Sequence, residues 1–210
     1  MSVPRRILPL IVIAQFCCTS LWFASNAVME ELAAAFALPP SALEHLTSAV
    51  QLGFLMGTLL FAILAIADRF SPSRVFVICG VVAAVSNLGA LLPGNTLFGL
   101  LVFRFFVGFC LAGIYPVGMK IAADYYASGL GRSLGYLVGA LVLGTAFPHL
   151  LGSLPVELDW RKVLVATSLL AVGGGVLLWT LVPDGPLRKA KSRQDFAAFF
   201  SVFKERDFRA

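Results

Sequence analysis

The sequence predicts an all-α integral membrane protein with six transmembrane helices. Of its 210 residues, 59% are hydrophobic and 13% are charged, whereas a soluble domain carries roughly 25% charged residues. The mean hydropathy is +0.90, and the 19 glycines fit a membrane protein because glycine is frequent in membrane helices. The formal charge of +5 could suggest a nucleic-acid partner, but the positions of the charges indicate membrane topology instead.

Six apolar runs have the length of a transmembrane helix, which needs about 20 predominantly apolar residues. They cover residues of about 7–28, 47–67, 75–92, 97–119, 133–152 and 162–182. For the first run, a cleavable secretory signal is the alternative, although its apolar part is long and Trp22 lies where a signal would end. Because the loops are short, we expect residues 1–182 to form one bundle without a separate soluble domain.

The basic residues predict the orientation, because cytoplasmic loops carry the excess of Lys and Arg. One side holds the N-terminus, the second and fourth loops and the tail, with Arg5, Arg6, Arg69, Arg74, Lys120, Arg132, Arg188 and Lys189. The other side holds Arg161 and Lys162, with Glu30, Glu31, Glu44, Glu157 and Asp159. We therefore expect both termini in the cytoplasm, and the protein in the bacterial inner (plasma) membrane.

The last stretch, residues 183–210, is predicted to be a basic cytoplasmic linker. The segment "VPDGP" breaks the sixth helix, and one helical face follows it. That face is formed by Phe196, Phe199, Phe200 and Phe203. Such a segment would lie in the membrane interface. The four cysteines all fall in apolar runs without a CxxC or Cys/His spacing, so they are interpreted as packing residues, and neither a metal nor an organic cofactor is implied.

The loop "IADRFSPSR" (66–74) concentrates charge between two apolar runs. Asp68 would stand at the end of a helix, where the helix dipole disfavours a carboxylate. It therefore needs a partner, either a nearby arginine or the N-terminus of another helix. A pairing that is made in one conformation and broken in another can act as a gate. The alternative is a solvated turn whose arginines only set the topology.

This loop resembles a motif of the major facilitator superfamily of transporters, Gly-x-x-x-Asp-Arg-x-Gly-Arg-Arg/Lys. Asp68 and Arg69 match it, and Arg74 supplies a basic residue slightly late. Leu64 replaces the first glycine, and the pair Ser71–Pro72 replaces Gly-Arg. The resemblance implies that Asp68, Arg69 and Arg74 form a cytoplasmic gate, which latches the outward-facing state against the second half of the transporter.

The fourth run contains "RFFVGFCLAG" (104–113), which resembles the fourth-helix pattern Arg-x-x-Gln-Gly-x-Gly-Ala-Ala of the same family. Arg104 and Gly108 match, while Val107 replaces the glutamine. An arginine inside a membrane helix is costly, by roughly 2.5–3.5 kcal/mol on insertion scales. Arg104 should therefore face protein or a water-filled cavity, or else snorkel to the extracytoplasmic interface.

The fifth run resembles the Gly-x-x-x-Gly-Pro-x-x-Gly motif of drug/proton antiporters, but Pro148 and His149 stand where Gly-Pro is expected. His149 is interpreted as an interfacial or packed residue rather than a proton relay. Small residues let membrane helices approach closely. The packing positions are Gly53, Gly57, Gly108, Gly131, Gly135, Gly139, Gly144, Pro148 and Gly152. The resemblance implies that the second and fifth helices contact the other half.

Polar residues inside the runs mark candidate cavity positions. Those selected are Gln15, Thr19, Trp22 and Asn26 on the first run, Gln51 on the second, and Arg104 and Tyr115 on the fourth. The alternative for each is a helix–helix hydrogen bond. No Asp or Glu lies inside any of the six runs, so a proton-binding carboxylate is expected outside this half, and an unpaired arginine favours a polar or anionic substrate.

The resemblance implies the N-terminal six-helix half, made of two three-helix repeats, of a protein whose substrate site lies between two halves. The partners would be the bilayer, a small-molecule substrate, and a second half from the same polypeptide, a second copy or another protein. The predicted function is secondary active transport of a small polar or anionic organic solute, with proton coupling open. The alternative within this class is efflux of amphipathic compounds.

Two other classes of protein fit the sequence less well. The segment "GRSLG" (131–135) fits a serine-nucleophile pattern, but His149 lies sixteen residues along the same predicted helix, about 24 Å away. A serine protease dyad therefore cannot form, and no enzyme is predicted. A six-span channel or scaffold lacks a visible filter segment or ring of like side chains.

Overall fold

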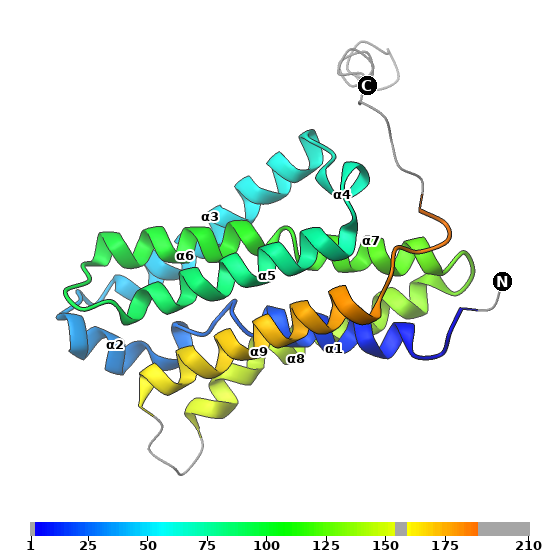
Figure 1. The fold of residues 1–210 in the computed structure, drawn as a ribbon. Coiled ribbons are helices and arrows are strands. Elements are labelled where there is room, and N and C mark those ends of the chain that lie inside the picture. Colours follow the sequence, from blue (N-terminus) through cyan, green and yellow to red (C-terminus); the bar gives the residue numbers. More distant parts are fainter. Residues whose placement is uncertain (1–2, 154–158, 189–210) are drawn as a thin grey trace, which may run out of the picture.

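The computed structural model describes residues 3–153 and 159–188, and in these ranges all regular structure is helical (Figure 1). The longer helices are α1 (Ile7–Thr19), α2 (Met29–Phe36), α3 (Ala42–Ile63), α5 (Pro72–Leu88), α6 (Leu97–Leu111), α7 (Tyr115–Tyr125), α8 (Leu130–Gly152) and α9 (Trp160–Leu181). Short pieces complete the chain: α4 (Ile66–Arg69) and the 3-10 turns η1 (Asn26–Val28) and η2 (Gly89–Leu91). The predicted amphipathic face at 196–203 lies outside the described residues.

Five helical segments are long and apolar enough to cross a membrane. They are α3, α5 with η2, α6 with α7, α8 and α9. The prediction of six full-length spans is therefore confirmed for five of them within the described ranges. The expected first span is different, because α1 has 13 residues, or about 20 Å of helix, against a hydrocarbon core of about 30 Å.

The first run is not one helix over 7–28, and side-chain competition at its break gives the reason. Thr19 Oγ1 donates to the Gln15 carbonyl at 2.8 Å, and Ser20 Oγ donates to the Cys17 carbonyl at 2.7 Å. Hydroxyls that bond back to the preceding turn weaken and bend a helix. The chain then continues through irregular turns into η1 and α2, so an apolar stretch of spanning length is divided.

The fourth span also contains a break, between α6 and α7. Pro116 stands in the first turn of α7, where its missing N–H and fixed φ are tolerated, but in a continuous helix its ring would clash with the preceding turn. After this break the helix runs on to Tyr125 rather than ending near residue 119. The extension places Lys120 and Asp124 on the same helix as the last turns of the fourth span.

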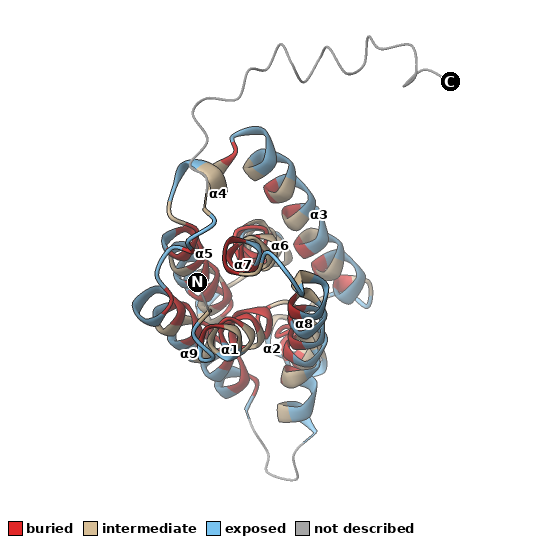
Figure 2. Ribbon diagram, turned by 90° about the vertical axis from the view of Figure 1, so that its right-hand side faces the viewer, coloured by how far each residue is buried: buried red, intermediate tan, exposed pale blue. Residues whose placement is uncertain are grey.

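The helix contacts follow the same pattern in the first three spans and in the last three (Figures 1 and 2). α3 packs on α6, α1 packs on α8, and α5 packs on α9. The first repeat contains the spans α1, α3 and α5, and the second contains α6 with α7, α8 and α9. Exchanging equivalent spans of the two repeats turns the contact of α3 with α6 into that of α8 with α1, and leaves the contact of α5 with α9 unchanged. The same set of contacts therefore serves both three-helix repeats.

α1 lies among α7, α8 and α9 and contributes much of the core. The buried positions of α1 are Ile7, Ile11, Ala14, Gln15, Cys17, Cys18 and Thr19, which together cover a wide face of the helix, as packing against three neighbouring helices requires. All four cysteines are free and buried. The Cys18 thiol donates to the carbonyl of Ala171 on α9, with a distance of 3.2 Å from sulfur to oxygen.

Candidate functional site

A charged cluster occupies the end of the bundle at which α4 lies; we call this end the α4 end. α3 ends at Ile63, and the chain turns at Ala65, whose φ of +48° is left-handed. α4 follows and carries Asp68 toward α7. There Lys120 Nζ lies 3.1 Å from the Asp68 carboxylate and 3.3 Å from that of Asp124. One ammonium thus joins two carboxylates from two elements.

The partner of Asp68 is a lysine of another helix. The prediction allowed a nearby arginine or a helix N-terminus, and the structure corrects this to Lys120. The two side chains are partly exposed, at 24% for Lys120 and 34% for Asp68. Water can therefore reach both groups, and the ion pair is weak enough for a conformational change to break it.

The Asp68–Lys120 pair lines a cleft between the last turns of α3 and the first turns of α7. The cleft has a volume of about 190 Å³. Besides the two charged residues, its walls include Thr58, Phe61, Pro116 and Val117. The Thr58 hydroxyl is buried and has no hydrogen-bond partner among the described residues. The α4 end therefore combines an apolar cleft with an ion pair at its edge.

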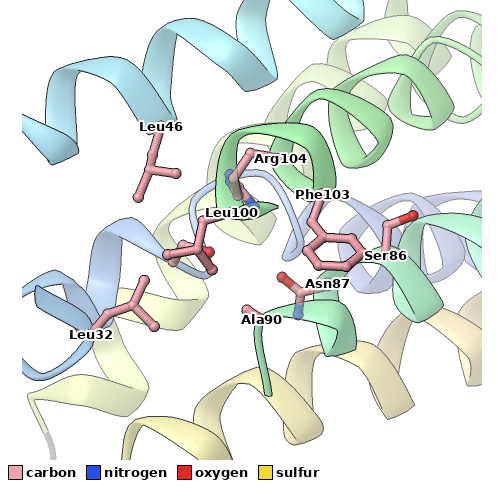
Figure 3. A pocket seen from close by; sticks show the side chains of 9 residues that line it. Leu32, Leu46, Ser86, Asn87, Ala90, Leu100, Phe103 and Arg104 are labelled. Carbon is pink, nitrogen blue, oxygen red and sulfur yellow. The ribbon is translucent and has the colours of Figure 1, made fainter. Parts of the chain in front are cut away.

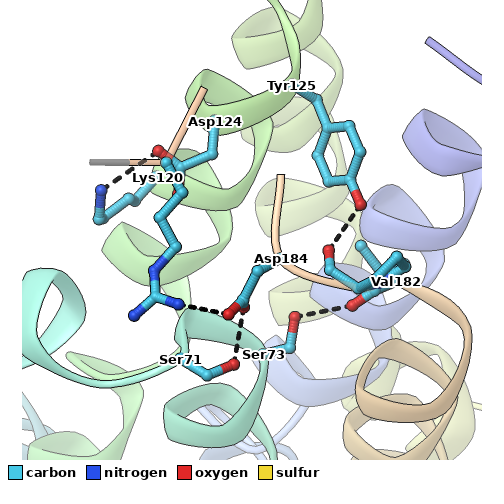
Figure 4. Close-up of polar contacts among 9 residues, drawn as sticks. Ser71, Ser73, Lys120, Asp124, Tyr125, Val182 and Asp184 are labelled. Atoms are coloured by element: carbon cyan, nitrogen blue, oxygen red, sulfur yellow. Dashed lines mark hydrogen bonds and ion pairs between the residues drawn. The ribbon is translucent and has the colours of Figure 1, made fainter. Parts of the chain in front are cut away.

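The segment that follows the sixth span packs against the other side of this cluster (Figure 4). Tyr125 Oη donates to the Pro183 carbonyl at 2.5 Å, and Ser73 Oγ donates to the Val182 carbonyl at 2.9 Å. The backbone N–H of Leu187 donates to the Asp124 carbonyl at 3.0 Å. A Cβ at Gly185 would collide with that carbonyl. The linker therefore starts in fixed contact with α5 and α7.

Arg69 and Arg74, the other two predicted gate residues, are both exposed. Neither forms an ion pair with a carboxylate in the described ranges. Both line a groove beside Asp184 and Arg188 rather than the cleft that Asp68 borders. The structure therefore brings Asp68 together with Lys120 and places the two arginines at a different site.

Arg104 is buried, with 3% of its surface exposed, and lies against the break in the first span. Its Nη1 donates to the Leu21 carbonyl at 3.1 Å, and its Nη2 donates to the Trp22 carbonyl. A cation is favoured where a helix ends and leaves carbonyls without partners. Arg104 thus neither snorkels nor opens to a wide cavity in this structure.

Beside Arg104 is a small void (Figure 3). Its volume is about 10 Å³, close to the smallest space that holds one water molecule. Ser25, Ser86 and Asn87 provide its polar lining, and Leu32, Leu46, Ala90, Leu100 and Phe103 provide apolar lining. Nδ2 of Asn87 also donates to Ser168 Oγ at 3.0 Å, which ties α5 to α9. This buried polar cluster was not predicted from the sequence.

The polar stripe predicted on the first run is distributed over several environments. Gln15 and Thr19 are fully buried, and the Gln15 amide has no hydrogen-bond partner within the described part of the chain. Trp22 is half-buried against Phe54, with ring centroids 4.8 Å apart. Asn26 Nδ2 donates to Thr47 Oγ1 at 2.7 Å. The break after Thr19 therefore divides the stripe, which is not one continuous face.

The two remaining cavity candidates are the more accessible ones. Gln51 on α3 is exposed, and Tyr115 at the start of α7 is half-buried. Both are therefore able to meet a solute or a second helical bundle, whereas Gln15 and Arg104 lie behind the surface.

The small residues separate into two groups. Gly53, Gly57 and Gly108 lie where α3 and α6 touch, and a Cβ at any of them would collide with the backbone of the facing helix. Gly53 and Gly57 are therefore helix-packing positions inside this bundle, between the second and fourth spans. On α8, Gly144 faces Thr19, and a Cβ at Gly152 would lie 3.1 Å from the Ala27 carbonyl. Pro148 is buried between them.

The first half of α8 is different. A Cβ added at Gly131, Gly135 or Gly139 would have no described atom of a neighbouring element within 4 Å. Spaced four residues apart, these glycines form one small-residue face of the helix. This face is exposed on the helical bundle.

Sequence reasoning missed Lys120 and Asp124 as site residues. Lys120 entered the prediction only as a topology charge, and Asp124 was not considered, because the expected fourth run ends near residue 119. Their i,i+4 spacing is the spacing at which oppositely charged side chains meet on a helix. That signal would have found them if the fourth helix had been extended through Tyr125.

The fold and this site describe a polytopic helical membrane protein with a charged cluster at one end of its bundle. The family model of the Major Facilitator Superfamily matches residues 11–209, which is nearly the whole chain. The chain belongs to this superfamily, and it is a membrane transporter of the major facilitator kind. A search of curated proteins finds no match for it.

Proposed function

We propose that this chain forms one half of a secondary active transporter that moves a small polar or anionic organic solute by alternating access. The substrate site would lie between this bundle and a second one, supplied by the same polypeptide, a second copy or a partner protein. Gln51, Tyr115, Trp22 and Asn26 are the positions we propose for the substrate surface. They are the predicted cavity residues that keep some exposure in this half.

The observation that carries the proposal is the shared ion pair at the α4 end. Asp68 belongs to the loop between the second and third spans, while Lys120 belongs to the fourth span. A change in the relative position of these segments would break the contact. Partly exposed pairs contribute only about 0.2–1 kcal/mol each, so the cluster can bias two conformations without trapping either.

The buried charge of Arg104 supports the substrate class. No carboxylate within the described ranges lies at ion-pair distance from its guanidinium, although two carbonyls accept its hydrogen bonds. A net positive charge inside the bundle favours a neutral or negative solute over a cation. We propose that Arg104 influences the choice of solute in two ways: by its positive charge, and by fixing the shape of the first span.

The exposed glycine face of α8 supports a second bundle. Gly131, Gly135 and Gly139 present backbone with no side chain over it. Small residues at this spacing allow a helix of another bundle to approach closely. We propose this face as the contact between the halves.

The test uses the full-length protein in cells supplied with a panel of labelled small carboxylates, phosphate esters and sugars. Uptake and efflux are both measured against cells without the protein, so an exporter is detected as well as an importer. A protonophore is added to assess proton coupling. Net movement of a polar or anionic solute supports the proposal, whereas transport confined to amphipathic cations contradicts it.

The latch is tested with the solute found. We expect Asp68→Asn and Lys120→Met each to change the initial rate by roughly fivefold, which corresponds to about 1 kcal/mol in the balance of two conformations. Because the two groups act on one contact, the double variant should behave like the stronger single one. Arg132→Gln, an exposed charge elsewhere, is the control. Wild-type rates in both single variants would exclude the latch.

A further inference from the structure

A second groove opens at the α4 end, between the first turn of α5 and the last turns of α9. Its volume is about 500 Å³. The polar residues that line it are Arg69, Ser71, Ser73, Arg74, Asp184 and Arg188. Trp179 of α9 forms part of its wall. Three guanidinium groups therefore surround one groove, and the proposed latch at Asp68 uses none of them.

The groove keeps a positive charge after its internal contacts are counted. Asp184 is the carboxylate in its lining, and that group accepts a hydrogen bond from Ser71 Oγ at 2.7 Å and pairs with Arg188 (Figure 4). Arg69 and Arg74 have no carboxylate partner in the part of the chain that is described. Arg188 Nε is buried and likewise has no acceptor among the described residues. The groove thus offers several donors to an anion.

The position of the groove points to a ligand in the membrane. It lies where two apolar helices of spanning length, α5 and α9, reach the same end of the bundle. Trp179 is 51% exposed, and tryptophan is enriched at the level of the lipid headgroups. Toward the middle of the membrane, large apolar side chains are exposed on both helices. They are Ile78, Val82 and Val85 on α5, and Val176 and Leu169 on α9.

We propose that this groove binds the phosphate headgroup of an anionic phospholipid, with the acyl chains lying along the exposed apolar sides of α5 and α9. Basic pockets between membrane helices suit anionic headgroups, and each basic side chain near an anionic leaflet adds to the attraction. Arg69 and Arg74 would contact the phosphate, and Trp179 would hold the groove at headgroup depth. This site is separate from the latch and does not depend on the transported solute.

Native mass spectrometry of the purified full-length protein tests the proposal. The protein is stripped of lipid and then mixed with phosphatidylglycerol or with phosphatidylcholine of the same acyl chains. We expect phosphatidylglycerol to be retained more strongly. Arg69→Gln and Arg74→Gln should each lower its retention by about fivefold, the factor expected from the attraction of one basic residue to an anionic leaflet.

Two matched variants separate this site from a general charge effect. Arg74→Lys keeps the charge and should retain most of the lipid. Arg132→Gln removes an exposed arginine at the start of α8, outside the groove, and should leave retention unchanged. Equal retention of the two lipids, or an equal loss in Arg132→Gln, overturns the proposal.

A further arm distinguishes a lipid headgroup from a soluble phosphate. Inorganic phosphate at millimolar concentration is added to the lipid-bound protein. A phospholipid held also by its acyl chains should stay bound. Displacement of the lipid by phosphate, or binding of phosphate without lipid retention, overturns the lipid assignment.

Discussion

At the scale of single residues, Arg104 shows how a buried charge is accommodated. Its guanidinium donates to the carbonyls of Leu21 and Trp22, which lie in the irregular turns after α1. The planar fork of arginine reaches two acceptors at once, which the ammonium of lysine does less well. The interaction joins the second repeat to the broken first span, and it explains why an arginine can lie in so apolar a helix.

This contact gives a prediction for stability. Arg104→Ala leaves two buried carbonyls without their donors and should lower the free energy of unfolding by about 2 kcal/mol or more, or Tm by about 5 °C. Arg104→Lys should fall between the alanine variant and the wild type. Thermal denaturation of the detergent-solubilised protein measures the difference. Arg132→Ala, on an exposed side chain, should denature as the wild type does, and an unchanged Tm in Arg104→Ala would refute the role.

The residue scale also shows where the sequence was sufficient. Asp68 could be selected because a carboxylate at a helix end needs a partner. Its partner could not be selected, because Lys120 is 52 positions away in the chain and meets Asp68 only through the tertiary fold. Arg69 matches the motif as well as Asp68 does, and Arg74 supplies its basic residue slightly late, yet both arginines line another groove.

At the scale of elements, the contact between α3 and α6 rests on glycines from both helices. Gly53 meets the Phe105 carbonyl, and Gly108 meets the Val50 carbonyl. Each helix therefore approaches the backbone of the other without a side chain between them, which increases van der Waals contact where no hydrophobic effect drives helices together. Glycine is required at these positions for close approach rather than for a special φ.

Gly108→Ala tests this contact. The added methyl group has no space and should cost about 1–3 kcal/mol by overpacking, which would appear as a lower Tm. Gly139→Ala is the matched control, because it adds the same methyl group to a membrane helix where no described atom of a neighbouring element lies within 4 Å. It should not destabilise the six-helix bundle. Equal Tm values in the two variants would show that α3 and α6 are not in this close contact.

At the scale of the whole molecule, the pairing of spans is symmetric between the two repeats, while the charges are not. The Asp68–Lys120–Asp124 cluster and the arginine groove both lie at the α4 end. The opposite end carries Asp159, which caps α9 through the Arg161 N–H, 3.0 Å away. The symmetric packing does not define which end of the bundle faces the cytoplasm. An asymmetric charge distribution can define it, because loops rich in Lys and Arg stay on the cytoplasmic side.

The orientation can be measured with introduced cysteines. Ser128→Cys lies between α7 and α8, and Ser153→Cys lies after α8; both positions are exposed. The four native cysteines are buried and should give little background. In intact cells, a membrane-impermeant maleimide should label the Ser153→Cys variant, and it should label Ser128→Cys only after permeabilisation. The reverse pattern would contradict cytoplasmic termini.

The membrane class, the approximate positions of most spans and the family motif at 66–74 could be read from the sequence, because these depend on local hydropathy and on residues that are near in the chain. The contacts of Asp68 and Arg104, the glycines that are covered, and the division of the first span after Thr19 became known only from the packed fold. Those features depend on helices that are distant in the sequence but packed together. The residue pattern of one helix shows which of its faces is apolar, but it does not identify the helix that packs there.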